Sequence, residues 1–416
     1  MATVHIVGAG LAGLACAVAL AARPHRIVLY EAAGQAGGRC RSLDDRDLGC
    51  RIDNGNHFLL TANRAALSYL DRIGARAELA GPRQTEFPFV DLGTGERWTL
   101  RPNPGPFPWW LLARSRRVPG TAPSHYLQGW RLAKAAESTT VTEAIAPAGP
   151  LWQRFWDPLA TAVLNTAPAE ASARLLWTVV RETFVAGGDA SRPLLARRCL
   201  DATFVTPALR YLEAAGAEIH LRRRLRGIDL QDGAAARLDF AEAPVELAEG
   251  DTVVLALPPT QAMALLPGLT APTASRSIVN AHYRVAALGG DPSDEPELLG
   301  LIGADAQWLV RRGPLVSVTV SAADTLVDAP AEDLATRLWA DVAKALDIAA
   351  EPLPPYRIIK EKRATFAQTP AEVAKRPGPK SFVRNVLLAG DWTATGLPAT
   401  IEGAIRSGQT AAASIP

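Results

Sequence analysis

The sequence predicts an α/β fold in which a discontinuous nucleotide-binding domain carries an inserted α+β domain with a helical cap. Three observations predict this fold. A glycine-rich turn lies between two apolar strands at the N-terminus, a strand and a helix close the chain, and β-rich and helical stretches alternate between them. The 416 residues, 48% of them hydrophobic, are enough for two or three domains with a large buried interior.

Composition excludes several classes of protein. The net charge of +2 is too balanced for nucleic acid to be the main partner. The four cysteines show neither metal-ligand spacing nor a dense disulfide framework, so we expect no metal and a reducing cytoplasm. No apolar run reaches the ~18 to 20 residues that a spanning helix needs, and no basic residue precedes the apolar N-terminal stretch as in a signal peptide. We therefore expect a soluble or peripheral cytoplasmic protein.

The N-terminal glycines predict a Rossmann-like dinucleotide site. Gly8 would make the tight turn after the first strand, Gly10 would let the backbone approach a pyrophosphate, and Gly13 would let the helix pack closely on the sheet. The helix that starts at Leu11 would direct its first amides at the phosphates. The second strand ends at Glu31, where a carboxylate meets a ribose hydroxyl.

A second glycine pair follows the ribose carboxylate. Gly37 and Gly38 precede Arg39, whose guanidinium would pair with phosphate oxygens, whereas Arg41 is as easily a solvated loop residue. With this extension the chain resembles the flavin-dependent amine oxidase and phytoene desaturase superfamily. The resemblance implies FAD rather than NAD.

The C-terminus resembles the same superfamily. An apolar strand over residues 386–389 runs into Gly390 and Asp391, and Thr400 is a suitable N-cap for a final helix. The resemblance implies that the aspartate holds the ribityl chain and that the helix N-terminus faces the flavin pyrimidine. A helix N-terminus stabilises the negative charge of a reduced flavin.

The middle of the chain supplies the last expected cofactor contacts. A hairpin is predicted at Asp232–Gly233, Arg222 to Arg224 are expected to form a solvated face, and the resemblance implies an adenine contact from the amide of Leu225. No second glycine fingerprint marks an NAD(P)H site, so the electron donor is unknown. The residues expected to contact FAD are Gly8, Gly10, Leu11, Ala12, Gly13, Glu31, Ala32, Gly37, Gly38, Arg39, Asn54, Gly55, Leu225, Ala256, Gly390, Asp391, Thr400 and Ile401.

Several longer stretches resemble one branch, the hydroxysqualene dehydroxylase family of bacterial hopanoid synthesis. They are residues 51–63, 154–173, 358–370 and 390–408, and the resemblance is thinnest over 85–140 and 270–350. Leu397–Pro398 replace the aromatic residue of the amine oxidase cage. The resemblance implies that hydroxysqualene and reduced flavin give squalene, water and oxidised flavin, with upstream and downstream squalene and hopene enzymes as potential partners. The alternatives are a carotenoid or phytoene-type desaturase and a flavin-free prenyl-lipid chaperone.

The chemistry of this reaction indicates which groups the protein must supply. An allylic hydroxyl can leave as water after protonation, and hydride from reduced flavin can quench the resulting cation. A proton donor and a dry pocket are needed. His57 is the candidate donor or water organiser, although it would serve equally by hydrogen bonding to flavin or backbone. Asp53 is a second candidate, with fixing of its loop as the alternative.

Other polar residues also have both functional and structural interpretations. Asn165 and Thr166 end an apolar helix, where they would either bind the substrate hydroxyl or complete the helix C-terminus. Asp157, before Pro158, is predicted as an N-cap. Glu402 is expected to serve a helix dipole or the flavin loop.

An apolar and basic stretch over residues 104–117 is predicted to contact a bilayer on the inner face of the cell membrane. Trp109 and Trp110 would enter the interface, and Arg114, Arg116 and Arg117 would meet anionic headgroups. An amphipathic helix is expected over residues 125–137. The alternative is a helical cap packed on the core.

The resulting domain prediction is discontinuous. The FAD-binding domain comprises residues 1–84, 200–265 and 380–416, and the substrate domain comprises 85–199 and 266–379 with a cap at about 105–190. Strands are expected within 277–288, 306–312 and 315–322, and a helix over 331–346.

Overall fold

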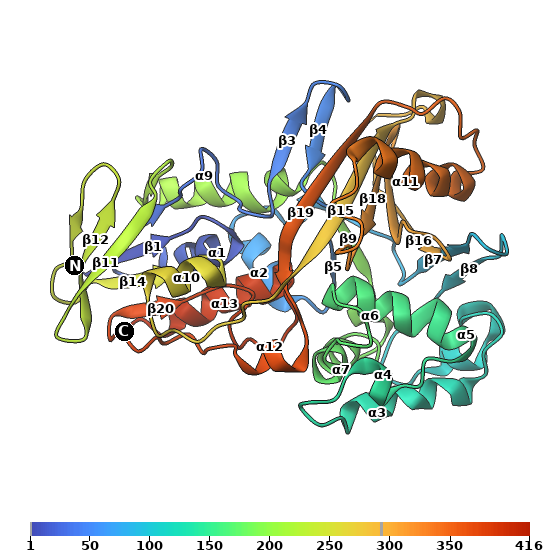
Figure 1. Cartoon of the computed structure of the whole chain (residues 1–416), viewed down its shortest axis with the longest axis horizontal. Coiled ribbons are helices and arrows are strands. Elements are labelled where there is room, and N and C mark those ends of the chain that lie inside the picture. Colours follow the sequence, from blue (N-terminus) through green and yellow to red (C-terminus); the bar gives the residue numbers. More distant parts are fainter. Residues whose placement is uncertain (1, 292–293) are drawn as a thin grey trace.

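The computed structural model of the chain describes residues 2–291 and 294–416, and it has two β-sheet bodies and a helical cap (Figure 1). Both termini lie at the end formed by the first body. Its parallel sheet has the order β10-β2-β1-β14-β20. The elements of this body are β1 (Thr3–Val7), α1 (Leu11–Leu20), β2 (Arg26–Tyr30), α2 (Arg64–Arg72), α9 (Thr206–Ala214), β10 (Glu218–His220), β11 (Leu225–Gln231), β12 (Ala234–Phe240), β13 (Val245–Glu246), β14 (Thr252–Leu255), α10 (Pro259–Leu265), β20 (Val386–Leu388) and α13 (Ile401–Ala413).

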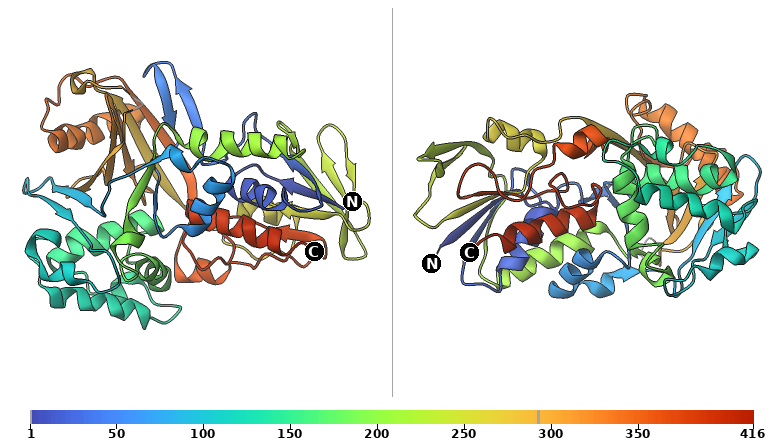
Figure 2. Two further views of the ribbon diagram at one scale, coloured as in Figure 1. Left: turned by 180° about the vertical axis from the view of Figure 1, so that it is seen from behind. Right: turned by 90° about the horizontal axis from the view of Figure 1, so that it is seen from below.

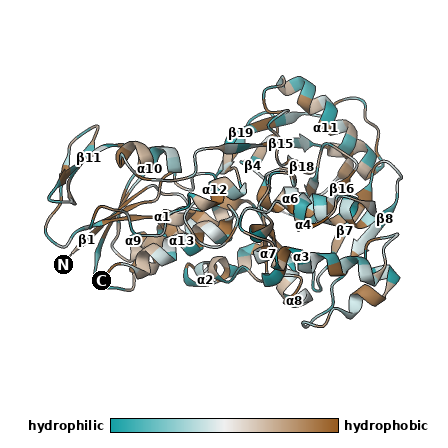
Figure 3. Cartoon of the chain, turned by 60° about the horizontal axis from the view of Figure 1, so that its bottom comes forward, coloured by the Kyte–Doolittle hydropathy of each residue, from teal (hydrophilic) through white to brown (hydrophobic). Residues whose placement is uncertain are grey.

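The parallel sheet is apolar on both faces, as expected for a sheet covered on each side (Figure 3). One face packs on α1, α9 and α13, and the other packs on α10 and the small antiparallel sheet β11-β12-β13. The helices α1 and α13 approach very closely, because a Cβ added to Gly408 would lie 2.0 Å from the carbonyl oxygen of Ala12. Segments from the start, middle and end of the chain therefore form one layered body.

The second body is a seven-stranded sheet of order β19-β15-β18-β17-β16-β7-β8. All its pairings are antiparallel except that of β16 with β7. One face is covered by α11, whose buried side chains pack on β15 and β18. The elements are β7 (Phe87–Asp91), β8 (Arg97–Leu100), β15 (Ser275–Arg284), β16 (Glu297–Ile302), β17 (Trp308–Arg312), β18 (Leu315–Val320), α11 (Ala331–Leu346) and β19 (Tyr356–Phe366).

The cap is built from short helices around a core rich in tryptophan and phenylalanine. It lies beside the seven-stranded sheet and away from the termini (Figure 2). Its elements are the 3₁₀ helices Trp109–Leu112, Arg114–Arg116 and Pro123–Gly129, the π-helix Trp152–Trp156, and α3 (Trp130–Ala133), α4 (Val141–Ala144), α5 (Gly149–Leu151), α6 (Asp157–Leu164) and α7 (Ala173–Glu182). The single amphipathic helix predicted over 125–137 is wrong, since a 3₁₀ helix and one α-helical turn occupy that segment.

Short elements connect these parts. They are β3 (Ser42–Asp45), β4 (Cys50–Asp53), β5 (Phe58–Leu60), the 3₁₀ helix Arg76–Glu78, β6 (Leu79–Ala80), α8 (Gly188–Ser191), β9 (Pro193–Ala196), the π-helix Asp201–Val205, the 3₁₀ helix Ala286–Leu288 and α12 (Pro370–Ala374). Strand β9 pairs with both β5 and β6, and β3 with β4 forms a hairpin.

The predicted α/β fold class is confirmed, and so are several individual elements. The hairpin turn has positive φ at both Asp232 (50°) and Gly233 (74°), as a two-residue turn between twisted strands requires. The expected strands of the second sheet and the helix over 331–346 are present. The N-cap predicted at Asp157 is wrong, because α6 continues directly from the preceding π-helix and Asp157 is its first residue. The domain boundaries stay a prediction.

Candidate functional site

The first glycine turn leaves open space at one of its three glycines. A Cβ on Gly8 would lie 2.3 Å from the carbonyl oxygen of Ala256, and one on Gly13 would lie 1.9 Å from that of Gly8. These two glycines are required by the packing of β1, α1 and β14. A Cβ on Gly10, in contrast, would meet no atom within 4 Å. The turn is therefore closely packed at Gly8 and Gly13 and open at Gly10.

The N-terminus of α1 faces this open space without a capping side chain. Its first intrahelical hydrogen bond runs from the amide of Leu14 to the carbonyl of Gly10, and no described side chain caps the helix. The amides of the first turn, including those of Leu11 and Ala12, thus have no acceptor within the helix. Such a helix end attracts a phosphate through its amides and its dipole.

Glu31 lies next to the turn and is held in one orientation. Its Oε2 accepts a hydrogen bond from the amide of Ala9 (2.9 Å). Its Oε1 accepts one from the amide of Ala33 (2.8 Å), and Ala32 lies between Glu31 and Ala33 in the chain. The carboxylate therefore sits at the edge of the glycine turn, in the place expected for a ribose-binding group.

The second glycine pair packs against the first. The amide of Gly37 donates to the carbonyl of Ala9 (2.7 Å), and Gly10 and Gly37 form a parallel β-bridge. Gly37 has a φ of 105° and Gly38 a φ of 57°, which a side chain would strain. The two glycine-rich segments thus form one continuous backbone surface.

Arg39, at the end of this surface, reaches the other terminus of the chain. Its Nη2 lies 2.8 Å from Oδ2 of Asp391, and its Nη1 donates to the carbonyl of Ala364. The side chain of Asp391 is buried, whereas that of Arg39 is 45% exposed. The guanidinium therefore retains surface for a further anion, and its predicted contact with a pyrophosphate stays a prediction.

The loop after β20 is held by an arginine that the sequence did not reveal. Arg376 donates to the carbonyls of Asp391 (3.0 Å) and Leu397 (2.8 Å) and to Oγ1 of Thr395 (3.0 Å), and it also donates to the carbonyl of Thr393. Burial lowers the pKa of Arg376 to about 10, so it remains charged at neutral pH. The residue stands in an irregular segment without a recognisable motif, so only its contacts reveal its role.

The final helix begins where predicted. Oγ1 of Thr400 accepts a hydrogen bond from the amide of Gly403 (3.1 Å), so the predicted N-cap is confirmed and Ile401 is the first helical residue. Gln368 fixes the approach to this helix, since its Oε1 accepts from the amide of Ala399 (3.0 Å) and its Nε2 donates to the carbonyl of Leu164 (2.6 Å). The buried Gln368 therefore links the cap to the C-terminal loop.

Glu402 serves a helix dipole, but that of a different helix. Its carboxylate accepts hydrogen bonds from the amides of Ala65 (3.1 Å) and Ala66 (2.8 Å), at the N-terminus of α2. It also pairs with Arg406 at 3.1 Å. A buried carboxylate from α13 thus caps α2 across the fold.

Asp53 is buried, and its carboxylate accepts hydrogen bonds from other residues of the protein. Its Oδ1 accepts hydrogen bonds from Oγ of Ser42 (2.7 Å) and from the amide of Leu200 (2.8 Å). Burial raises the pKa of the Asp53 carboxyl, although the charge of Arg312 opposes that shift. These bonds support the loop-fixing interpretation of Asp53 over a catalytic one.

The next two residues are fixed from the second sheet. Nδ2 of Asn280 donates to the carbonyl of Asn54 (3.2 Å), and Oδ1 of Asn280 accepts from Oγ1 of Thr319 (2.7 Å). A Cβ on Gly55 would lie 3.1 Å from Asn280. The loop that precedes His57 therefore takes its shape from β15 and β18.

His57 has an unusual combination of exposure and desolvation. Its side chain has exposed surface, yet burial, with the charge of Arg39 second, lowers its pKa to about 4. With a pKa of about 4 the imidazole is uncharged at neutral pH, so the role of His57 as a proton donor or water organiser stays a prediction.

Asn165 takes part in a structural network. It ends α6 with a φ of 44°, its Nδ2 donates to Oγ1 of Thr365 (3.0 Å), and its Oδ1 accepts from the amide of Ala322 (2.7 Å). Thr166 accepts from the amide of Gln368 (3.0 Å). These contacts support the helix-terminus interpretation of both residues over contact with a substrate.

Three further residues expected to contact FAD, Ala256, Leu225 and Gly390, lie in the first body. The amide of Ala256 donates to the carbonyl of Val7 (2.8 Å), which places Ala256 behind Gly8. Leu225 pairs with Phe240 in the small antiparallel sheet. The amide of Gly390 donates to Oγ of Ser407 (2.8 Å), which ties β20 to α13.

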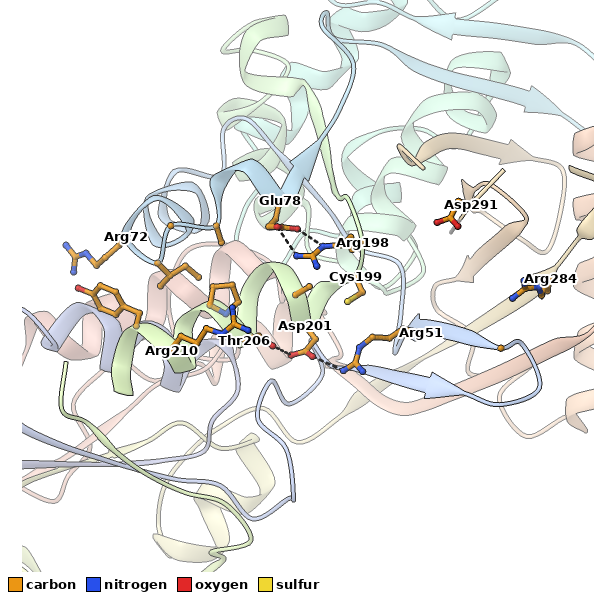
Figure 4. Close-up of a pocket in the computed structure, with 17 residues that line it drawn as sticks. Arg51, Arg72, Glu78, Arg198, Cys199, Asp201, Thr206, Arg210, Arg284 and Asp291 are labelled. Atoms are coloured by element: carbon orange, nitrogen blue, oxygen red, sulfur yellow. Dashed lines mark hydrogen bonds and ion pairs between the residues drawn. The ribbon is translucent and has the colours of Figure 1, made fainter. Parts of the chain in front are cut away.

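A groove of about 1140 Å³ lies outside this constellation (Figure 4). Arg51 pairs with Asp201 at 2.8 Å and Arg198 with Glu78 at 2.9 Å, and these side chains point toward one another in the groove. None of the residues expected to contact FAD lines it. Two of its lining residues, Cys199 and Asp201, flank Leu200, whose amide donates to Asp53.

Two of the residues predicted to touch a bilayer are buried, so the prediction is wrong for them. Trp110 packs in the aromatic core of the cap, with its ring 5.5 Å from that of Tyr126. Arg117 donates to the carbonyls of Thr121 (3.0 Å) and Leu111 (2.6 Å). Trp109 remains exposed, with the guanidinium of Arg116 stacked 4.6 Å from its ring centre.

Two kinds of feature are absent from the described residues. No helix in residues 2–291 or 294–416 combines the length and the apolar composition that crossing a bilayer requires. Over the same residues, no three His, Cys, Asp or Glu side chains gather as metal ligands would.

The constellation fits a dinucleotide with a flavin at one end. The open space at Gly10 would be entered by an added Cβ, the first-turn amides of α1 have no acceptor within the helix, and the carboxylate of Glu31 lies beside the glycine turn. Asp391 pairs with Arg39, and the loop that follows Asp391 leads to the N-terminus of α13. Residues from both termini thus form a single candidate cofactor site.

Comparison with known proteins also indicates a flavin-containing oxidoreductase. The family profile described as flavin containing amine oxidoreductase matches residues 11–416. The hydroxysqualene dehydroxylase of Rhodopseudomonas palustris is 47% identical over 99% of this chain and 97% of its own length, and that of Sinorhizobium fredii is 44% identical over 98% and 97%. A 15-cis-phytoene desaturase of Glycine max is 24% identical over 99% and 78%. A putrescine oxidase structure shares the fold, with a TM-score of 0.70 at 17% identity, covering 100% of this chain and 98% of that one.

Proposed function

Because the chain belongs to the flavin containing amine oxidoreductase family and, within it, to the hydroxysqualene dehydroxylases, we propose that it converts hydroxysqualene to squalene. The chain is an FAD-dependent oxidoreductase. The observation that carries the proposal is the 47% identity with a hydroxysqualene dehydroxylase over 99% of the chain. The candidate cofactor site supports it independently.

The proposed roles of the cofactor residues follow from their positions. The amides at the start of α1 and the backbone of Gly10 and Gly37 would hold the pyrophosphate. Glu31 would bind the adenosine ribose, and Asp391 would bind the ribityl chain. Arg39 would balance the charge of both phosphate and aspartate.

The reaction is balanced by one hydride and one proton. The C–O bond to the hydroxyl breaks, the oxygen leaves as water, and a C–H bond forms at the carbon. FAD in its reduced form supplies the hydride. We propose that His57 acts as a neutral hydrogen-bonding group that orients the leaving hydroxyl or a water, because its lowered pKa leaves little imidazolium at neutral pH. The proton would come from solvent and reach the hydroxyl through a water that His57 orients, so that the oxygen leaves as neutral water.

Contact with a membrane is proposed to bring the apolar substrate to the enzyme. An isoprenoid such as hydroxysqualene partitions into a bilayer, so the enzyme must take it from there. The exposed Trp109 and the neighbouring Arg114 and Arg116 support a peripheral position on the inner face of the cell membrane. Trp110 and Arg117 are left out because they are buried.

Product analysis tests the proposed reaction. Purified protein is incubated in detergent either with hydroxysqualene and reduced FAD or with phytoene and oxidised FAD, and the extracted products are identified by mass spectrometry. We expect squalene from the first substrate and unchanged phytoene from the second. Coloured, desaturated products from phytoene would favour the alternative desaturase. Lipid binding by a protein that retains no FAD would favour the prenyl-lipid chaperone.

A further inference from the structure

One segment of the cap has a strongly one-sided charge. Residues 102–136 contain five Lys and Arg residues and no Asp or Glu, in a chain whose net charge is only +2. The buried Arg117 donates its hydrogen bonds to carbonyl oxygens within the cap, which leaves Arg114, Arg116, Arg131 and Lys134 toward solvent. A cationic segment of this kind is attracted to an anionic surface.

The same segment exposes most of the large apolar side chains found on the surface. Within the part of the chain that the structure describes, five of the eight exposed large hydrophobic residues lie between residues 107 and 130. They are Phe107 (73% exposed), Trp109 (43%), Leu112 (69%), Leu127 (65%) and Trp130 (53%). Scattered apolar residues need no explanation, but five within one short segment indicate an interaction surface.

Three of these side chains, Trp109, Leu112 and Leu127, come from two 3₁₀ helices that touch. Phe107 precedes the first of these helices, and Trp130 begins α3. The ring of Trp110 meets the ring of Tyr126 at 5.5 Å, edge to face. Trp109 and Leu127, their immediate neighbours, therefore flank a shared contact. The 3₁₀ helices Trp109–Leu112 and Pro123–Gly129 thus present their exposed apolar side chains from adjacent positions.

A hollow of about 660 Å³ opens beside this apolar surface. Its polar lining comes from Ser124, His125, Gln128 and Arg131, and Leu127 also lines it. Residues 148–151 form the opposite wall. The side chain of Arg131 makes no hydrogen bond or ion pair with any residue of the described chain. The hollow therefore offers an unneutralised guanidinium together with hydroxyl, amide and imidazole groups.

We propose that this hollow binds the phosphate of an anionic phospholipid headgroup while Leu127 and Trp130 enter the acyl boundary beside it. Guanidinium groups pair bidentately with phosphate oxygens, and Ser124 and Gln128 can donate further hydrogen bonds. The proposal deepens the proposed membrane contact, but it does not depend on which reaction the enzyme catalyses.

The surroundings of the hollow select a lipid over a soluble phosphate. Leu127 both lines the hollow and exposes 65% of its surface, so a ligand in the hollow would touch an apolar side chain that is otherwise in water. A lipid buries that surface, whereas a free anion leaves it hydrated. The absence of acidic residues from 102–136 further favours an anionic over a zwitterionic surface.

Vesicle binding by the full-length protein tests this site. Sedimentation compares vesicles of phosphatidylcholine alone with vesicles that also contain phosphatidylglycerol. The variant Arg131→Gln removes the guanidinium, and Arg131→Lys keeps the charge. The matched control is Arg46→Gln, because Arg46 is an exposed arginine in the β3–β4 turn, outside the cap. Circular dichroism verifies that each variant is folded.

We expect Arg131→Gln to weaken binding to the phosphatidylglycerol vesicles by about fivefold, the factor that corresponds to ~1 kcal/mol for one basic group at the surface. Arg131→Lys should stay within about twofold of the wild type, and Arg46→Gln should be unchanged. The variant Trp130→Ser should weaken binding to both kinds of vesicle, since its contribution is apolar.

Equal binding of the wild type and Arg131→Gln to phosphatidylglycerol vesicles would overturn the proposal. Displacement of the vesicles by soluble glycerol phosphate at equal phosphate concentration would instead identify a site for a free anion, and would overturn it too. The dehydroxylation assay is run in detergent without phospholipid, so loss of that activity and loss of vesicle binding are separate results.

Discussion

Arg39 and Asp391 form an ion pair of 2.8 Å although they stand 352 positions apart in the chain. Arg39 follows the second glycine pair, and Asp391 follows the last strand of the parallel sheet. The pair joins the segment that faces the open side of the first glycine turn to the loop that precedes the final helix. The two ends of the polypeptide are therefore connected at the candidate cofactor site.

We expect substitution of Arg376 to weaken FAD binding indirectly, through the loop that this arginine holds. Arg376 holds four acceptors in the segment from Asp391 to Leu397, and lysine cannot reach them all with one ammonium group. Loss of one hydrogen bond to a charged group costs ~1.5–3 kcal/mol. Arg376→Lys should therefore lower the free energy of unfolding by about 2 kcal/mol and increase FAD dissociation. Urea unfolding and flavin fluorescence measure the two effects.

The matched control for Arg376 is Arg363→Lys, because Arg363 is an exposed arginine within β19. It should change neither quantity. A variant at Arg376 with wild-type stability and wild-type FAD affinity would show that the loop does not depend on this guanidinium.

Two glycines of the first turn should respond differently to alanine. In Gly10→Ala the new methyl group meets no protein atom within 4 Å, so the apoprotein should remain as stable as the wild type while FAD affinity falls. In Gly13→Ala the methyl group would lie 1.9 Å from the carbonyl of Gly8, so the fold itself should be destabilised. Thermal unfolding of the apoproteins and FAD titration distinguish the two. Equal FAD affinity in Gly10→Ala and the wild type would contradict the proposed pyrophosphate position.

Acid should destabilise the protein partly through His282. Burial, with the charge of Arg312 second, lowers the pKa of His282 to about 4, whereas an unfolded chain has a histidine pKa near 6.5. The unfolded state therefore takes up a proton first as the pH falls, and stability is lost between about pH 6.5 and pH 4. The full contribution of this one group is about 3 kcal/mol.

The variant His282→Gln isolates that contribution. The ring Nδ1 lies 2.7 Å from Oγ of Ser317, a contact that an amide can replace. We expect urea unfolding free energies of the variant to fall less steeply than those of the wild type across this pH window. Parallel pH profiles would show that His282 is protonated equally in the folded and unfolded states.

The paired tryptophans of the cap should have opposite roles. Trp109→Ser should reduce sedimentation with phosphatidylglycerol vesicles and leave unfolding unchanged, because its side chain is exposed. Trp110→Ser should cost ~3–5 kcal/mol of stability, because it empties a position in the aromatic core of the cap. If Trp110→Ser were as stable as the wild type, the burial of that ring would be in doubt.

The fold could be predicted where local pattern and packing agree. The glycine turn, the Asp232–Gly233 hairpin and the amphipathic helix over 331–346 each carry their own signal, and each is present. The prediction of regular helix was wrong in the cap, where the helical turns depend on tertiary packing. The 3₁₀ helix Pro123–Gly129 and the π-helix before α6 replace regular helix there, and neither has a periodic signal in the sequence.

Of the candidate cofactor site, only the residues that belong to sequence motifs could be predicted from the sequence. Arg376, Gln368 and Asn280 fix the loops around the candidate flavin position through contacts that span large separations in sequence. Nothing in their immediate sequence distinguishes them from solvated polar residues. Similarly, the lowered pKa of His57 arises from burial and from Arg39, and neither is visible before the chain folds.

Single turnover under anaerobic conditions tests the central claim most directly. The bound FAD is reduced, hydroxysqualene is added without any other electron acceptor, and the return of the oxidised flavin spectrum is followed alongside squalene. We expect one squalene for each flavin that is oxidised. A flavin that stays reduced in the presence of hydroxysqualene, or one that is oxidised without squalene, would contradict it.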